Sequence, residues 1–281
     1  MPLETRVYEP DNAVKKGIFG VFRSILKEIY SNKWLIYQLF RRDFISMYRQ
    51  SFAGIMWAFF MPLVAAGTFF VLNKSGVFNA GSIPVPYALY AFSGLIFWQV
   101  FSSGIAASCV SLVKAGPMVV KINFSKKSLV ISSMGQAVIA FLIQVLVFAT
   151  LCAYYGFNPS YRLLTLPFFL VPLFFFTLSL GFIFSVLNGI ARDTGNITNI
   201  LVSFFLFLTP VLYIKPKHGL LAAVTEYNPL YYFVSVPRDY VLYGSIEGLG
   251  CYWLVTAFTA IFFIVSITAF HFTESRIAER I

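Results

Sequence analysis

Long runs without a charged residue dominate the hydrophobic pattern of this chain and alternate with short polar segments. The runs cover 51–72, 87–113, 128–161, 163–191, 194–214 and 248–273. Because an apolar helix of about 20 residues crosses the hydrocarbon core of a bilayer, each run can hold one span. Asn158, Pro159 and Pro167 indicate a turn between the third and fourth runs. The pattern predicts an all-α integral membrane protein with six transmembrane helices, at 51–72, 87–113, 128–155, 166–190, 195–214 and 249–271.

The segments outside these runs are polar and charged. Residues 1–50 predict a cytoplasmic N-terminus, and 274–281 a short cytoplasmic tail. The first 30 residues carry charges throughout and lack the apolar core of a signal peptide. Within 31–50 an amphipathic helix is expected, because apolar residues recur at helical spacing at Ile36, Phe40, Phe44, Met47 and Tyr48. The opposite face carries Gln38, Arg41, Arg42, Ser46 and Arg49. Such a helix lies in the membrane interface, either as a simple basic anchor or as a contact for lipid phosphates or a cytoplasmic partner.

The loop between the fifth and sixth runs has a helix signal of its own. Asn228 at an N-cap and Pro229 at the first helical position predict a helix start, and Pro237 predicts a kink or an end. We expect two short apolar helices within 218–243 that re-enter the outer leaflet. Turns at that depth need protein or water around them, so these helices are expected to line a cavity or a pore mouth.

The distribution of charge gives the orientation. The chain is 59% hydrophobic and only 11% charged, with a net charge of +10. Of its 21 Lys and Arg residues, sixteen fall on the side that contains both termini and five on the other side. Positive residues concentrate on the cytoplasmic side, so both termini are expected there. The bias also explains most of the net charge without nucleic acid as a partner.

The chemistry that most enzymes and ion-coupled transporters need is missing from the spans. No acid lies at the centre of a span, and the chain has no phosphate-binding loop of the GxxxxGK[ST] type. Cys109, Cys152 and Cys251 have no metal-ligand spacing. We therefore expect no catalytic residue, metal or cofactor in this chain. If it drives transport, the energy comes from another chain.

Aromatic residues are abundant instead, with 33 Phe, 16 Tyr and 4 Trp. Two interpretations stay open. The aromatic side chains can face lipid and form interfacial belts. They can also line a pore in which their faces stack on sugar rings.

Several short motifs follow one another in a familiar order. They are Arg42-Asp43-Phe44, Tyr48-Arg49-Gln50-Ser51 with Gly54, Trp57 and Pro62, the basic loop Lys114–Lys127, Arg192-Asp193, Thr209-Pro210-Val211 with Tyr213, and Asn228-Pro229-Leu230 with Arg238. In this order, over roughly residues 40–270, the chain resembles the permease subunits of polysaccharide-exporting ABC transporters (O-antigen, teichoic acid or capsule). One departure is Phe124-Ser125-Lys126, where the family often has Phe-Pro-Arg.

The resemblance implies a mechanism and its partners. Two copies of the chain would form a pore in the bacterial inner membrane and contact two copies of a separate ATPase subunit, which holds ATP and magnesium. The cargo would be an undecaprenyl-diphosphate-linked polysaccharide, attracted by Arg41, Arg42 or Arg49. Asp43 would pair with Arg42 or Arg192 as a rigid joint, or form an ordinary interfacial ion pair.

The resemblance also implies three groups of site residues. Contact with the ATPase would fall to Arg41, Arg42, Asp43, Arg49, Lys121, Phe124 and Lys126. The polysaccharide would meet Phe59, Phe60, Phe69, Phe70, Phe204, Phe207 and Tyr213. The outer gate would comprise Asn228, Pro229, Tyr231, Tyr232 and Arg238.

Two other functions remain open from the sequence. The first is an ABC permease that exports a lipid or a drug. The second is a membrane-embedded glycosyl- or acyltransferase, which would need acids or histidines at one membrane face. His218, Glu226 and Asp239 form a sparse outer cluster of that kind.

Overall fold

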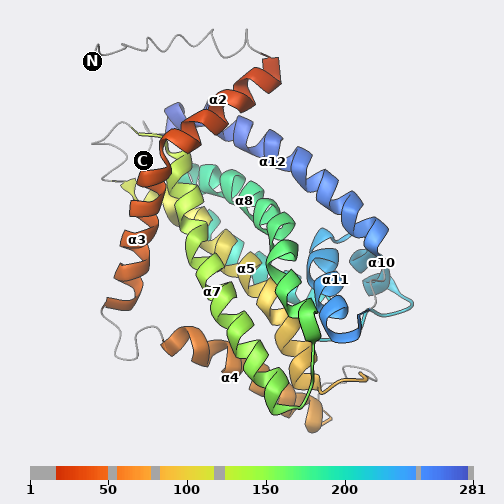
Figure 1. Cartoon of the computed structure of the whole chain (residues 1–281). Coiled ribbons are helices and arrows are strands. Elements are labelled where there is room, and N and C mark those ends of the chain that lie inside the picture. Colours follow the sequence, from red (N-terminus) through yellow and green to blue (C-terminus); the bar gives the residue numbers. More distant parts are fainter. Residues whose placement is uncertain (1–16, 50–55, 77–82, 117–123, 245–247, 278–281) are drawn as a thin grey trace.

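The computed structural model describes residues 17–49, 56–76, 83–116, 124–244 and 248–277, and these form helices and turns with no strand (Figure 1). The elements are α2 (Gly17–Ser31), α3 (Lys33–Arg49), α4 (Trp57–Lys74), α5 (Tyr87–Lys114), α7 (Lys127–Tyr154), the short 3-10 helix η2 (Ser160–Thr165), α8 (Leu166–Ile190), α9 (Thr194–Leu208), α10 (Leu220–Tyr227), α11 (Pro229–Tyr243) and α12 (Leu249–Ile277). The all-α prediction is therefore confirmed for the described residues.

Four of these segments are long and apolar enough to cross a membrane. They are Tyr87–Lys114, Lys127–Tyr154, Tyr161–Ile190 and Leu249–Glu274. The chain is therefore a multi-pass membrane protein. The predicted spans 51–72 and 195–214 correspond to α4 and α9, which are not among the four, and residues 50–55 lie outside the described part.

The centre of the bundle is α5, against which α7 and α8 pack along most of their length (Figure 1). Small residues allow this close approach. A Cβ on Gly181 of α8 would lie 2.6 Å from the Cβ of Ser108, and one on Gly104 would lie 2.9 Å from the sulfur of Met134. Without a hydrophobic driving force between helices in lipid, close contact over small residues is what holds such helices together.

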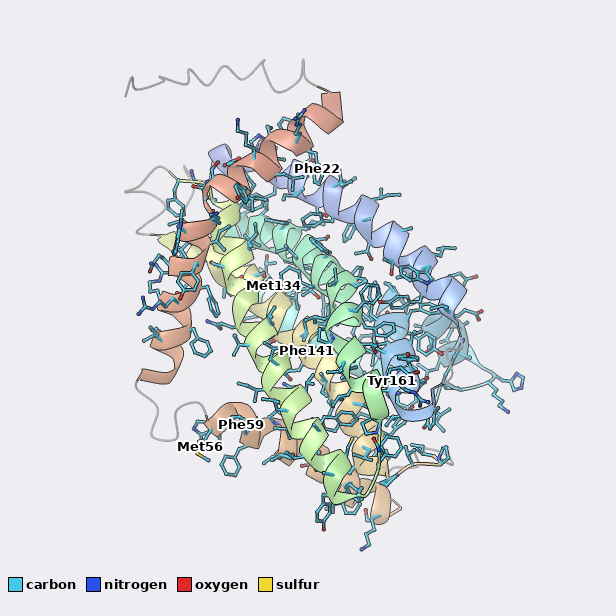
Figure 2. The ribbon with its side chains drawn as sticks, viewed as in Figure 1. Phe22, Met56, Phe59, Met134, Phe141 and Tyr161 are labelled. Atoms are coloured by element: carbon cyan, nitrogen blue, oxygen red, sulfur yellow. The ribbon has the colours of Figure 1, made fainter. Side chains whose placement is uncertain are left out.

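The two ends of the bundle carry different elements. At one end α2 and α3 lie beside the start of α7 and the end of α12, and at the other lie α10 and α11 (Figure 1). Val21 and Ile25 of α2 are buried in a small core with Ile267 and Phe270 of α12. In Figure 2, Phe22 lies where α2 meets α12. Helix α4 crosses the far half of the α5–α7 pair.

Two predicted boundaries differ from the structure. The N-terminal region forms two helices, α2 and α3, where one at 31–50 was predicted, because Val21 and Ile25 give α2 its own apolar face. Helix α12 continues to Ile277, past the predicted 271. Pro237, predicted to kink or end the second outer helix, lies inside α11, and α11 ends at Tyr243, which is also the end of the predicted range 218–243.

The fifth predicted span also ends early. Helix α9 stops at Leu208, and residues 209–213 form a turn in place of the predicted helix to 214. The cause is Pro210, which lacks an amide hydrogen and disfavours helical geometry in the residue before it. Thr209 accordingly has extended backbone angles, with φ −104° and ψ 127°.

Candidate functional site

A cluster of charged groups joins three helices at the end of the bundle that carries α2. The ammonium of Lys127, at the start of α7, is fully buried and lies 3.2 Å from Glu28 Oε2 of α2. The same ammonium contacts Glu274 Oε1 of α12 and lies 3.1 Å from Nδ1 of His271. The ammonium therefore links α2, α7 and α12 at one point. We call these four residues the Lys127 cluster.

Three residues of the Lys127 cluster could also serve as metal ligands. Atoms of Glu28, His271 and Glu274 that could bind a metal lie within 4.8 Å of one another. The Lys127 ammonium already lies beside them and supplies the positive charge that a cation would bring. A fully buried lysine requires such partners, because an unpaired buried charge is very costly. With Lys127 in place the cluster acts as a structural joint between α2, α7 and α12.

Helix α3 separates its polar and apolar faces as predicted. Leu39 is buried and Phe40 packs onto Gly135 of α7 so closely that a Cβ on Gly135 would overlap the phenyl ring. The predicted contact residues Arg41 and Arg42 are exposed on the other face. A basic face is therefore open to a partner, while the apolar face binds α3 to the bundle.

Asp43 forms an ion pair with its neighbour. Its Oδ1 lies 2.9 Å from Nη2 of Arg42, so Arg42 is the partner and not the exposed Arg192. The predicted coupling residues Phe124 and Lys126 are half-buried beside the start of α7. Lys121 and the side chain of Arg49 lie outside the described part.

At the opposite end of the bundle, side chains of α5 hold the 209–213 turn. Tyr87 donates a hydrogen bond to the carbonyl of Leu212 at 3.1 Å, and Tyr90 donates one to Tyr213 at 3.0 Å. A Cβ on Gly94 would lie 2.5 Å from the carbonyl oxygen of Val211, so only glycine lets the turn lie this close. The backbone that ends α9 is thereby bound to the central helix.

Arg238 of α11 holds the same turn from the other side. Its Nη1 donates to the carbonyls of Pro210 at 2.8 Å and Val211 at 3.3 Å, and its Nε donates to Asp239 at 2.9 Å. The guanidinium also lies over the ring of Tyr90, 4.1 Å from the centroid. Burial alone would lower the pKa of Arg238, but the Asp239 carboxylate outweighs it and raises that pKa. The arginine therefore stays charged although only 3% of its surface is exposed.

Asn228 is the predicted N-cap of α11, and this prediction is confirmed. Its side-chain oxygen accepts a hydrogen bond from the amide of Leu230 at 3.0 Å, and Pro229 begins the helix. Its amide nitrogen also donates to the buried hydroxyl of Thr209 at 2.8 Å. Asn228 thus caps α11 and ties it to the end of α9.

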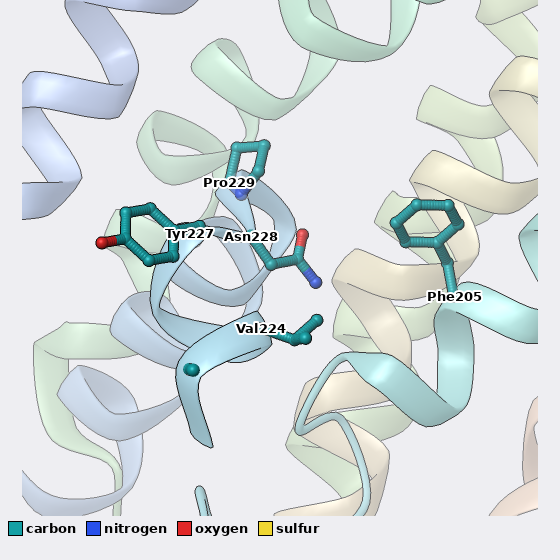
Figure 3. Close-up of a pocket in the computed structure, with 6 residues that line it drawn as sticks. Phe205, Val224, Tyr227, Asn228 and Pro229 are labelled. Carbon is teal, nitrogen blue, oxygen red and sulfur yellow. The ribbon is translucent and has the colours of Figure 1, made fainter. Parts of the chain in front are cut away.

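An open cavity of about 440 Å³ lies beside this cap (Figure 3). Phe205 of α9 stands on one side, and Val224, Asn228 and Pro229 on the other. An apolar cavity of about 310 Å³ shares Phe205, Asn228 and Pro229 and extends between α8 and α9. Helix α9 contacts α5 and α8, but the two cavities lie along part of it, and Thr198 is its one buried residue among those described.

The residues predicted to meet the polysaccharide lie in separate places. Phe60 and Phe70 on α4 and Phe204 and Phe207 on α9 are exposed on the single chain. Phe59 is half-buried against the main core, and the side chain of Phe69 lies outside the described part. Tyr213 is half-buried and donates to the carbonyl of Phe207 at 2.6 Å. One copy of the chain does not bring these side chains together.

Similarity to known proteins identifies the family. Residues 35–242 match the model of the ABC-2 type transporter family. This chain belongs to the ABC-2 type transporters. The matched region begins in α3 and ends at the last turn of α11, so it includes α10 and most of α11 but neither α2 nor α12. The chain is accordingly the membrane subunit of a transporter and not a catalyst.

Proteins from two bacteria resemble this ABC-2 type chain. The O-antigen export system permease protein RfbA of Klebsiella pneumoniae is 24% identical over 251 residues, which cover 87% of this chain and 94% of the relative. A second Klebsiella pneumoniae protein of that name is 25% identical with the same coverage. The RfbA protein of Myxococcus xanthus is 26% identical over 193 residues, 67% of this chain and 72% of the relative.

The sequence did not indicate the Lys127 cluster or the interaction of Arg238 with the 209–213 turn. Lys127 stands in a basic loop where every lysine looks solvated, and its partners are about 100 and 147 positions away. A weak signal existed in Glu274 and His271, which are three positions apart at the end of an apolar run and so share a helix face.

Proposed function

We propose that this chain is the permease subunit of an ABC exporter that carries O-antigen, or a related lipid-linked polysaccharide, across the bacterial inner membrane. The observation that carries the proposal is the family match over 35–242 together with relatives that are named O-antigen export permeases. ATP hydrolysis would occur on a separate subunit, since the sequence has no phosphate-binding loop of its own.

The proposed topology has six spans and cytoplasmic termini. Helices α4 and α9 would complete the four long apolar segments, with α10 and α11 re-entering from the outer side. The charge bias supports this orientation, because the sixteen Lys and Arg residues on the side of the termini outnumber the five on the other side. The Lys127 cluster would then lie on the cytoplasmic side and Arg238 on the outer side.

The ATPase subunit would bind at the cytoplasmic end. Exposed Arg41 and Arg42 and the half-buried Phe124 and Lys126 lie on the elements that flank this end. Movement of the ATPase would reach the bundle through two contacts already described, Phe40 on Gly135 and the Lys127 cluster. Both contacts attach the N-terminal helices to α7, so a push on α2 or α3 would move a long apolar helix directly.

The pore would form between two copies of the chain. Exposed apolar side chains are dense on α9, where Ile197, Ile200, Phe204 and Phe207 each expose more than half of their surface. A second copy would cover part of this face and leave Phe204 and Phe207 to contact the sugar chain. An uncharged aromatic channel suits the passage of a polysaccharide, because it binds no single sugar unit tightly enough to stop the movement of the polymer.

Gene deletion combined with a binding measurement tests this proposal. Deletion in the native strain is expected to abolish surface polysaccharide, and the purified chain is expected to bind an ABC ATPase subunit and stimulate its ATP hydrolysis. Arg41→Glu should weaken that binding, whereas Lys74→Glu, an exposed lysine at the far end of α4, should leave it unchanged. Intact surface polysaccharide after deletion, or a purified chain that binds no ATPase, would exclude the proposal. A change in drug resistance or lipid export alone would favour the alternative cargo.

A further inference from the structure

A third cavity, of about 580 Å³, lies at the end of the bundle that carries α10 and α11. It lies between the start of α5, residues 214–217, α10 and α11. Its volume is within the range of about 300–1,000 Å³ typical of small-molecule sites. The lining differs from that of the apolar cavities beside α9, because it combines aromatic rings with groups of both charges. Its charged lining residues are Lys215, Lys217, Arg238, Glu226 and Asp239, and its rings include Tyr231 and Tyr243.

The inner wall of this cavity is fixed in place. Arg238 and Tyr90 form it, and both also hold the 209–213 turn through hydrogen bonds to its carbonyls. Arg238 is 3% and Tyr90 2% exposed, so neither side chain has room to move. A wall that is already rigid costs little conformational entropy when a ligand binds to it.

The remaining lining groups have hydrogen-bonding capacity to spare. Asp239 uses Oδ1 for Arg238, and its Oδ2 has no partner among the described residues. The exposed carboxylate of Glu226 likewise makes no hydrogen bond or ion pair within the described part of the chain. Lys215 holds its ammonium 5.2 Å from the centroid of the Tyr231 ring, and both Lys215 and Lys217 line the cavity. Two carboxylate acceptors and two lysine donors therefore line the same space.

Charges of both signs line the cavity. The positive charge of Arg238 is already used by Asp239 and two carbonyls, whereas Lys215 and Lys217 add two positive charges and Glu226 adds one negative charge. A phosphate or carboxylate ligand could use the two lysines but would be repelled by Glu226 and Asp239. A neutral ligand rich in hydroxyl groups could instead donate to both carboxylates and accept from the lysines, so it would use groups of both charges.

We propose that this cavity binds neutral sugar residues of a glycan. Sugar hydroxyls donate to Glu226 and Asp239 and accept from Lys215, and the apolar C–H face of a ring lies on Tyr231 or Tyr243. The identity of the glycan as the exported polymer rests on the proposed function. In that case the site lies where the polysaccharide leaves the transporter, separate from the pore aromatics of α4 and α9. It holds each newly exported segment of the polysaccharide and prevents that segment from sliding back.

Photo-crosslinking in the native strain tests the site with its own glycan. Ala222 of α10 lines the cavity and carries none of the proposed contacts. Ala222→p-benzoylphenylalanine is expected to give glycan-modified protein on irradiation. The signal should fall at least fivefold when Glu226→Gln and Lys215→Ala are added, and it should be unchanged by Lys74→Ala, outside the cavity. Cells that export polysaccharide normally but give no crosslink would overturn the inference and leave the proposed function intact.

Binding to the purified protein provides a measurement that does not depend on transport. Saturation-transfer NMR with neutral trisaccharides of glucose, galactose and mannose should show saturable binding to at least one of them, and Glu226→Gln should weaken it at least fivefold. Inorganic phosphate should not compete. Competition by phosphate, or sugar binding unaffected by Glu226→Gln, would contradict the site. Failure of export with normal sugar binding would instead count against the proposed function alone.

Discussion

Replacing Lys127 by methionine should break the joint between α2, α7 and α12 without leaving a cavity. The side chain is fully buried, whereas the partner carboxylates of Glu28 and Glu274 are 25% and 15% exposed. Removing one partner of a buried ion pair costs about 3–5 kcal/mol, because the remaining charge stays buried without compensation. Since solvent reaches both carboxylates in part, we expect a loss of about 3 kcal/mol, at the lower end of that range.

Substitutions of Glu28 and Glu274 show how much of the lost free energy depends on each partner of Lys127. Glu28→Gln should cost less than about 1 kcal/mol, because Glu28 is the more exposed acid. Adding Glu274→Gln to Lys127→Met should recover at least half of the loss, because it removes the uncompensated charge. Lys126→Met is the matched control, since the neighbouring ammonium makes no ion pair among the described residues.

Reversible unfolding in mixed detergent micelles measures these free energies, and trypsin reports the position of α2. Arg23 and Lys27 are exposed on α2, and cleavage there should become faster in Lys127→Met if the helix leaves the bundle. The reasoning is refuted if Lys127→Met stays within about 1 kcal/mol of the wild type, the size of a surface pair. It is also refuted if Lys126→Met is equally damaging.

Three further substitutions test other contacts by the same unfolding assay. Gly135→Ala should destabilise the protein by about 1–3 kcal/mol, because the new methyl group overlaps Phe40. Gly67→Ala is the control and should be neutral or stabilising, because its methyl group meets open space. Equal effects of the two substitutions would contradict the close contact between Gly135 and Phe40. Asn228→Ala should cost about 0.5–2 kcal/mol through the lost N-cap, and no loss would show that α11 needs no cap. Arg238→Met should release the 209–213 turn and expose it to proteolysis while α2 stays protected; simultaneous cleavage of α2 would indicate global unfolding instead.

The sequence predicts the long helices well because one physical signal specifies them. Runs free of charge and about 20 residues long have few alternatives in a membrane, and the predicted 87–113 and 166–190 correspond to Tyr87–Lys114 and Leu166–Ile190. The start of α11 was also predictable, because the Asn-Pro pair has a local mechanism. Helix α9 was predicted too long, since its apolar run continues through Pro210, where the backbone geometry changes.

The contacts that define the two ends could not be predicted, because they join distant positions. Lys127 and Glu274 are charged residues at the edges of apolar runs, and nothing local distinguishes them from solvated neighbours. The resemblance assigned Arg238 to an outer gate. Its hydrogen bonds to the carbonyls of Pro210 and Val211 depend on the 209–213 turn, where the hydrophobic pattern predicted a helix. Which aromatic residues face a pore also depends on a second copy of the chain.

The Lys127 cluster has a consequence for biogenesis. Helix α2 leaves the ribosome before α12, but its buried face is completed only by α12, which also supplies Glu274 to the Lys127 ammonium that Glu28 contacts. More than 200 residues separate the two helices. At about 5–20 residues per second the ribosome needs on the order of 10–50 seconds to synthesise the chain between α2 and α12. During that interval the apolar face of α2 has no finished site to occupy. The order of synthesis therefore delays the docking of α2 until α12 is in place, and a chain truncated before α12 would leave α2 undocked.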